Sequence, residues 1–228
     1  MSQEQVLSEE GAAAPGGRRW TRRVGVVLVL TGSILLGWVA WQFWGTNWAS
    51  ERQHREIVTA LERQWAGAEG PEPFGDADAI VRIPRFGDDY AVPVLAGTND
   101  EVLAAGYGHF DGAADPGELG NYALAGHRVT NGEPLRRMPE LVAGDEVIVE
   151  TATATHVYVL DTGGEDLTVS FTDTWVVDPL PTNPRRGGVQ PPSQEEGQRL
   201  ITLTTCSEIF RTDNRLIAFG HLLETIEK

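Results

Sequence analysis

The sequence predicts an all-β barrel or sandwich that follows an N-terminal membrane helix and a helical stalk. Eight short runs rich in Val, Ile, Leu, Thr and aromatic residues succeed one another after residue 79, separated by turn residues. No long helical pattern interrupts them, which is typical of an all-β domain. The expected organisation is a cytoplasmic disordered tail (1–23), a transmembrane anchor (24–44), a stalk helix with linker (45–78) and a β-domain (79–228).

The composition is that of a globular protein with a core, because 41% of the residues are apolar and 8% aromatic. The net charge is −15 at pH 7, which argues against a nucleic-acid partner, since a phosphate backbone requires a basic surface. The sequence has no zinc-type Cys/His spacing, no calcium loop and no glycine-rich nucleotide loop. We therefore expect neither a metal nor a cofactor.

The apolar stretch over residues 24–44 reads "VGVVLVLTGSILLGWVAWQFW" and contains no charge. A bilayer is crossed by about 20 apolar residues, whereas the apolar core of a cleaved signal peptide usually has about 7–15. Tryptophans typical of a membrane interface stand at its end, at Trp41, Trp44 and Trp48. Positive charges precede it at Arg18, Arg19, Arg22 and Arg23. The positive-inside rule then predicts a cytoplasmic N-terminus, a single-pass anchor in the cell membrane and an extracellular domain.

The elements follow in order along the chain. Ile57, Leu61 and Trp65 recur every four residues, which predicts a helical stalk with one apolar stripe. A Gly- and Pro-rich linker ends it. The predicted strands are 79–86, 90–95, 121–127, 145–151, 155–161, 172–178, 199–206 and 215–224. A short helix is predicted within 132–141, and 181–198 is the longest stretch of loop-like composition.

Cys206 is the single cysteine of the chain. In an exported domain a structural cysteine normally has a partner, so this residue is either a small buried hydrophobe or a reactive thiol. Its polar neighbours Thr205 and Ser207 favour a nucleophile. A free thiol has a pKa of about 8.5, so nucleophilic use calls for a cationic neighbour. Arg215 in the next predicted strand, or one of the five histidines, could supply it.

Among the histidines, His127 is modestly favoured over His109. His127 ends the apolar run "YALAGH" and precedes a turn, which places a titratable group at a loop mouth. His109 lies in the turn-like "GYGHFDG". We expect His54 to be solvated on the stalk, His156 to be an exposed strand position and His221 to be an ordinary residue of the last strand.

Two motifs resemble the sortases, the cysteine transpeptidases of Gram-positive cell envelopes. One is "TLTTC" (202–206), followed nine residues later by the arginine of "RLIAFG". The other is "GELGNYALAGHRVTNGEPLRRMPELVAGDEVIVET" (117–151). The likeness is greatest to the class E sortases of actinobacteria and covers the anchor and residues 79–225. It implies a closed, eight-stranded, mostly antiparallel sortase-type β-barrel.

The resemblance also implies roles. Cys206 would be the nucleophile, His127 the general acid/base, and Arg215 the group that holds the substrate carbonyl and stabilises the oxyanion. Thr205 would support the oxyanion or the substrate. Arg211 is a second arginine after the cysteine, so the choice of Arg215 rests on spacing and on the strand that follows.

The implied substrates are C-terminal sorting signals of the LAxTG or LPxTG type, cleaved at the Thr–Gly bond. The implied acceptor is an amine of a peptidoglycan precursor or of a pilin. In sortases the loop before the cysteine strand, here 181–198, contributes to the signal groove. Two other readings stay open: a cysteine hydrolase that does not transfer its product, and a non-catalytic cell-surface β-barrel that binds a partner.

Overall fold

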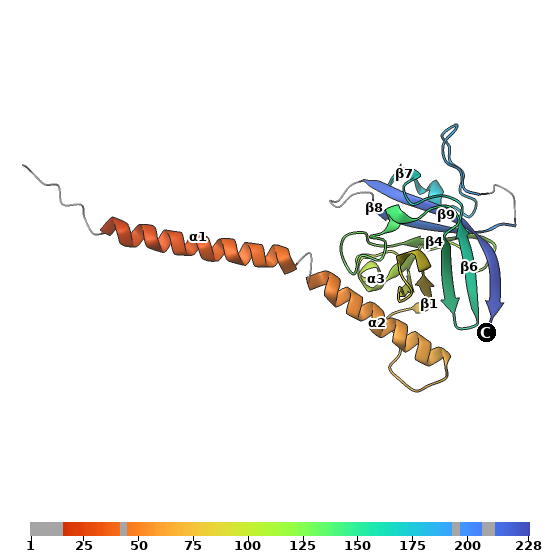
Figure 1. The fold of residues 1–228 in the computed structure, drawn as a ribbon, viewed down its shortest axis with the longest axis horizontal. Coiled ribbons are helices and arrows are strands. Elements are labelled where there is room, and N and C mark those ends of the chain that lie inside the picture. Colours follow the sequence, from red (N-terminus) through yellow and green to blue (C-terminus); the bar gives the residue numbers. More distant parts are fainter. Residues whose placement is uncertain (1–15, 42–44, 193–196, 207–212) are drawn as a thin grey trace, which may run out of the picture. The chain divides into compact units, whose positions relative to one another are not determined.

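The chain forms two compact units, Met1–Gln42 and Phe43–Lys228. The computed structural model describes residues 16–41, 45–192, 197–206 and 213–228. Figure 1 shows helix α1 (Gly16–Ala40) in the first unit and the strands in the second.

Within the described residues, α1 is the one helix that is long and apolar enough to cross a membrane. Its window Trp20–Val39 has 20 residues and a mean hydropathy of 1.6. At about 1.5 Å per residue, this length matches the hydrocarbon thickness of a bilayer. The anchor predicted at 24–44 overlaps this window, and its residues 42–44 lie outside the described residues.

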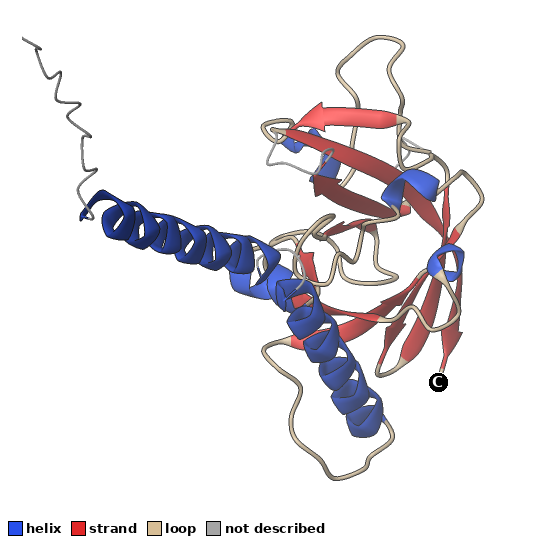
Figure 2. Ribbon diagram, turned by 60° about the vertical axis from the view of Figure 1, so that its left-hand side comes forward, coloured by secondary structure: helices blue, strands red, loops and turns tan. Residues whose placement is uncertain are grey.

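The second unit is built on one sheet of nine strands in the order β6-β5-β1-β2-β3-β4-β8-β9-β7. An additional pairing of β6 with β9 closes eight of them into a barrel, while β7 pairs, among the described strands, with β9. This confirms the predicted closed, eight-stranded barrel (Figure 2). The strands are β1 (Ala77–Arg82), β2 (Val92–Ala96), β3 (Tyr107–His109), β4 (Gly120–Ala125), β5 (Glu146–Thr151), β6 (Ala154–Leu160), β7 (Leu167–Ser170), β8 (Arg199–Cys206) and β9 (Asn214–Glu227).

Closure depends on the length of β9, which has 14 residues. Its first residues pair with β7 and its last with β6, while β8 lies along its other edge. Gly220 lies where β9 meets β6, and a Cβ there would stand 2.5 Å from the carbonyl oxygen of Val159. A larger residue would therefore push the two strands apart at the closing seam.

Most strand pairs are antiparallel, but β2 runs parallel to β3 and β4 runs parallel to β8, with Ala125 opposite Thr204. Parallel neighbours end at the same edge of a sheet. The residues that follow β4 therefore lie beside the last residues of β8.

Side-chain alternation along β8 separates the barrel core from an outer face. Ile201 and Leu203 belong to the main core cluster. Thr202, on the other face, donates its hydroxyl hydrogen to Asn121 Oδ1 at 2.9 Å. A smaller apolar cluster covers this outer face and includes Val169, Val176 and Ile217. The end of β8 thus lies between two packed layers.

Helix α2 (Thr46–Trp65) packs on the barrel through the stripe predicted from the sequence. Ile57 and Leu61 are buried against Ile80 and Leu95 of the first two strands. The same cluster contains Ala105 of helix α3 (Asp100–Ala105). Residues 46–65 therefore belong to the same compact unit as the barrel, and burial of this stripe provides much of the hydrophobic stabilisation of the helix.

Several local predictions were wrong. Residues 172–178 do not form a strand: Thr174–Val177 is a short 3-10 helix, η4, that buries Val176. The helix predicted within 132–141 reduces to a 3-10 turn, η3 (Met138–Glu140). His54 is not solvated, because 4% of its surface is exposed. The short strands β3 and β7 and helix α3 were not predicted.

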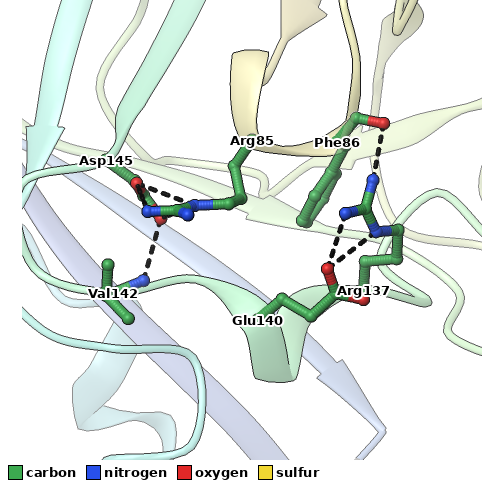
Figure 3. A network of polar contacts seen from close by, with 6 residues as sticks. All are labelled: Arg85, Phe86, Arg137, Glu140, Val142 and Asp145. Carbon is green, nitrogen blue, oxygen red and sulfur yellow. Dashed lines mark hydrogen bonds and ion pairs between the residues drawn. The ribbon is translucent and has the colours of Figure 1, made fainter.

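Two arginines brace the loops at η3 and at the 3-10 turn η2 (Pro84–Phe86), as Figure 3 shows. Arg85 holds the carboxylate of Asp145 through both of its oxygens, and the Val142 N–H donates to the same carboxylate at 2.9 Å. The Arg85 hydrogen bonds lower the pKa of Asp145. Arg137 donates to the carbonyl oxygen of Phe86 at 2.7 Å, which joins the two turns.

Candidate active site

Cys206 is the last residue of β8 and lies directly opposite Arg215, the second residue of β9. Opposite residues of an antiparallel pair project to the same face, with Cβ atoms about 4.5–5.5 Å apart. Both side chains are partly exposed. The register of the two strands therefore makes Arg215 the direct neighbour of Cys206, and the Arg215 guanidinium donates to the carbonyl oxygen of Asn214 at 3.0 Å.

His127 follows β4 by two residues and lies at the same edge of the sheet as Cys206. The hydrogen bonding between β4 and β8 continues one residue past β4, because the Gly126 N–H donates to the Thr204 carbonyl oxygen at 3.1 Å. His127 is partly buried, and its carbonyl oxygen accepts a hydrogen bond from the Leu135 N–H at 3.0 Å. Its backbone is thus held on both sides.

Thr205 is buried, with 3% of its surface exposed. Its hydroxyl donates to the carbonyl oxygen of Gly126 at 2.7 Å. This bond fixes the residue immediately before His127 to the residue immediately before Cys206. Thr205, to which the family resemblance gives a supporting role, therefore ties the two candidate catalytic segments together through its hydroxyl.

One cavity of about 650 Å³ is lined by all four of these residues: His127, Thr205, Cys206 and Arg215. Further lining comes from Val169 of β7, which pairs directly with Arg215, from Phe171 just after β7, and from Val176 of η4. Sequence reasoning missed this part of the lining, because it assigned 172–178 to a strand and did not find β7. Arg215 and Ile217 are two residues apart on β9, so their side chains share the face of the strand that lines the cavity.

Charged groups of both signs line the cavity. Asp100, Asp173 and Asp213 contribute carboxylates, and Arg215 contributes a guanidinium. Asp173 accepts the Ser170 N–H at 2.9 Å, so the turn after β7 fixes its orientation. The lining therefore combines a cation next to Cys206 with carboxylates that favour a cationic group, and Asp173 also lies 4.0 Å from the guanidinium of Arg185.

The other histidines lie in different environments. His54 is buried, which lowers its pKa from 6.5 to about 4. His156 is also buried, contrary to the sequence prediction, and its Nδ1 lies 3.1 Å from the hydroxyl of Thr225. His109 Nε2 lies 3.0 Å from the carbonyl oxygen of Ala114, and His221 pairs with Asp161 at 2.7 Å.

Of the five histidines, only His127 is among the described residues that line the cavity. Arg211 lies outside the described residues. Within the described part of the chain, no group of three or more His, Cys, Asp or Glu side chains could hold a metal ion.

Comparisons with known proteins agree with this architecture. A family model described as a sortase domain matches residues 81–223. The chain belongs to the sortase family. Sortases are cysteine transpeptidases, so membership confirms the family resemblance of the two sequence motifs.

Among relatives, Sortase SrtE1 of Streptomyces coelicolor is 34% identical over 236 residues, which cover 98% of this chain. The match spans 63% of the length of that relative. Sortase E from Streptomyces avermitilis has a solved structure that is 40% identical, with a TM-score of 0.57, covering 68% of this chain and 92% of that one.

A second solved structure is Sortase E1 from Streptomyces coelicolor with a tripeptide in its active site. It is 32% identical and has a TM-score of 0.55, and the match covers 67% of this chain and 91% of that one. Both of these solved structures are of class E sortases, which agrees with the class expected from the sequence motifs.

Proposed function

We propose that this chain is a membrane-anchored sortase that transfers proteins bearing a C-terminal sorting signal to an amine. The signal is of the LAxTG or LPxTG type, and the bond cleaved is the Thr–Gly amide. The observation that carries this proposal is the single cavity lined by Cys206, His127 and Arg215, in a chain of the sortase family.

In the first half of the reaction, the Cys206 thiolate attacks the threonine carbonyl carbon. The C–S bond forms as the carbonyl π electrons move to oxygen, where the guanidinium of Arg215 stabilises the negative charge. His127, as imidazolium, gives its proton to the glycine nitrogen as the C–N bond breaks. The products are a thioester on Cys206 and a free glycine amine.

In the second half, an incoming amine attacks the thioester carbonyl and His127 accepts a proton from it. The tetrahedral intermediate collapses, the C–S bond breaks and the thiolate is restored. Thr205 supports this site by holding the backbone before His127. We propose an amine of a peptidoglycan precursor or of a pilin as acceptor, and the carboxylates at the cavity rim favour a cationic amine.

We further propose that α1 anchors the enzyme as a single-pass helix with the N-terminus in the cytoplasm. The apolar window Trp20–Val39 and the four arginines between residues 18 and 23 support this orientation. Because Cys206 is the only cysteine in the chain, thiol labelling shows on which side of the membrane the cavity lies. A membrane-impermeant maleimide should label it on intact cells; labelling only after lysis would contradict an extracellular cavity.

The test of function uses the full chain in detergent micelles with LAxTG and LPxTG peptides and an excess of a small amine. Mass spectrometry should detect exchange at the Thr–Gly bond, and Cys206→Ala should abolish it. Release of the acid without exchange would identify a hydrolase. If neither peptide forms a thioester with the wild type and Cys206→Ala changes nothing, the transpeptidase assignment is wrong and a binding role is favoured.

A further inference from the structure

The loop between His127 and Leu135 has an unusual backbone. Three consecutive residues adopt left-handed conformations: Asn131 with φ 55°, Gly132 with φ 77° and Glu133 with φ 48°. Two of the three carry a Cβ, and such residues rarely adopt this region. Strained backbone of this kind persists only where the surroundings hold it.

The ends of this loop are bonded to each other and to Tyr90. The Leu135 N–H donates to the carbonyl oxygen of His127 at 3.0 Å, so the far end of the loop is tied to the candidate catalytic residue. The hydroxyl of Tyr90 donates to the carbonyl oxygen of Pro134 at 2.7 Å. Neither bond reaches the strained residues in the middle.

Glu133 has bonds within the loop, from its N–H to the Thr130 carbonyl and from its carboxylate to Arg136. Asn47 joins the middle of the loop to helix α2. Its Oδ1 accepts the Gly132 N–H at 3.2 Å, and its Nδ2 donates to the carboxylate of Glu133. Both ends of one amide are thus used, on two of the three strained residues. The first turn of α2 contains no acidic residue, and Glu133 brings a carboxylate to this end of the helix, where negative charge is favourable.

His54, two turns along α2, fills the space beneath the same loop. A Cβ at Gly132 would lie 2.7 Å from His54 Cε1. The loop therefore lies directly against α2 at two points, Asn47 and His54. The apolar side of α2 also packs on α3, and Asp100 and Leu103 of α3 line the cavity.

We propose that Asn47 is a positioning residue for His127. It holds the loop that is closed onto the His127 backbone, and so it sets where the imidazole lies relative to Cys206. The inference rests on the proposed function for the role of His127, and its physical basis is the pair of side-chain bonds from α2. Helix α2 is then part of the catalytic apparatus as well as the segment that follows the membrane helix.

The experiment compares the full chain in detergent with Asn47→Ala, which removes both bonds. A matched control is Gln64→Ala, which deletes an exposed amide from the last turn of the same helix. Because a small misplacement of a catalytic group is costly, we expect Asn47→Ala to lower kcat by roughly 10- to 100-fold with little change in KM. Gln64→Ala should match the wild type.

A paired rescue separates positioning from general loss of stability. Asn47→Asp keeps the acceptor for Gly132 but places a carboxylate against Glu133, so it should be at least as slow as Asn47→Ala. Adding Glu133→Gln to Asn47→Asp restores a donor and acceptor with their roles exchanged. We expect this double variant to recover most of the lost kcat, whereas Glu133→Gln added to Asn47→Ala should recover none.

Two readouts do not require turnover. The pH dependence of Cys206 alkylation by iodoacetamide and the NMR titration midpoint of the His127 ring proton should both shift in Asn47→Ala. If the wild type shows no exchange while these shifts occur, the proposed function fails and the positioning role stands. Wild-type kcat, alkylation and titration in Asn47→Ala, or a loss of rate that only follows the unfolded fraction, would overturn the positioning role.

Discussion

Cys206 and Arg215 are direct partners across β8 and β9, and both line the cavity. The two residues are nine positions apart in the chain, and the register of one antiparallel pair brings them together. A guanidinium at this place keeps its charge at any pH that the protein meets. This register agrees with the proposed role of Arg215 as the oxyanion-stabilising group, whereas Arg211 lies outside the described residues.

Replacing Arg215 tests this choice. Arg215→Ala is expected to lower kcat by about 10²–10³, the usual effect of removing one preorganised oxyanion donor. Arg215→Lys should recover only part of the rate, because an ammonium lacks the planar fork of the guanidinium. Arg211→Ala is the matched control in steady-state kinetics and should retain most of the rate. Equal losses from the two alanine variants would mean that Arg215 is the wrong arginine.

The pH profile tests the pairing of Cys206 with His127. If one group must be deprotonated and the other protonated, kcat/KM should follow a bell-shaped curve. His127→Ala should lower the rate by about 10²–10⁴ and remove one limb of the bell. A profile measured with a single peptide substrate between pH 5 and 10 is sufficient. A wild-type bell that survives in His127→Ala would assign the acid/base role to another residue.

Thr205 tests the link between the two catalytic segments. Thr205→Val keeps the shape of the side chain but leaves the buried carbonyl of Gly126 without its 2.7 Å donor. The expected cost is about 1–3 kcal/mol in the free energy of unfolding, measured in urea. Thr205→Ser should behave like the wild type. If Thr205→Val lowered kcat at unchanged stability, the threonine would act on the substrate and not through Gly126.

His54 should make the fold sensitive to acid. Burial lowers its pKa to about 4, so between pH 6.5 and 4 the unfolded chain binds a proton that the folded chain does not. Stability therefore falls as the pH drops through this window, by about 2 kcal/mol between pH 7 and 5. His54→Leu removes the titrating group. Between pH 7 and 5 the free energy of unfolding of this variant should therefore fall by about 2 kcal/mol less than that of the wild type. Parallel pH dependences of the two proteins would contradict a buried, neutral His54.

Most strands were predictable because their signals are local, whereas the closed barrel and the roles of the site residues were expected from the resemblance to sortases. The strands β1, β2, β4, β5, β6, β8 and β9 carry long apolar or alternating runs, and the motifs around Cys206 and His127 stand at strand ends. Strands β3 and β7 have three and four residues, too few for a periodic pattern. Residues 172–178 have strand-like composition, but Thr174–Val177 form a 3-10 turn that buries the side chain of Val176.

The support of the site could not be predicted, because its contacts join distant parts of the chain. Asn47 and Glu133 are 86 residues apart, and Thr205 and Gly126 are 79 apart. The helical pattern of residues 50–65 shows which residues share a stripe, but it does not show what covers the opposite side. His54 was therefore assigned to solvent, although the loop after His127 folds over it.

The position of Asn47 bears on how a water-soluble form of this protein is prepared. Removing the apolar helix requires a cut between it and the barrel, and a start near residue 50 would keep His54 and the buried stripe of α2. Such a fragment should fold and dissolve, yet it would lack the amide that holds the His127 loop. Its measured rates would then understate those of the intact enzyme, whereas a start at residue 45 would retain them.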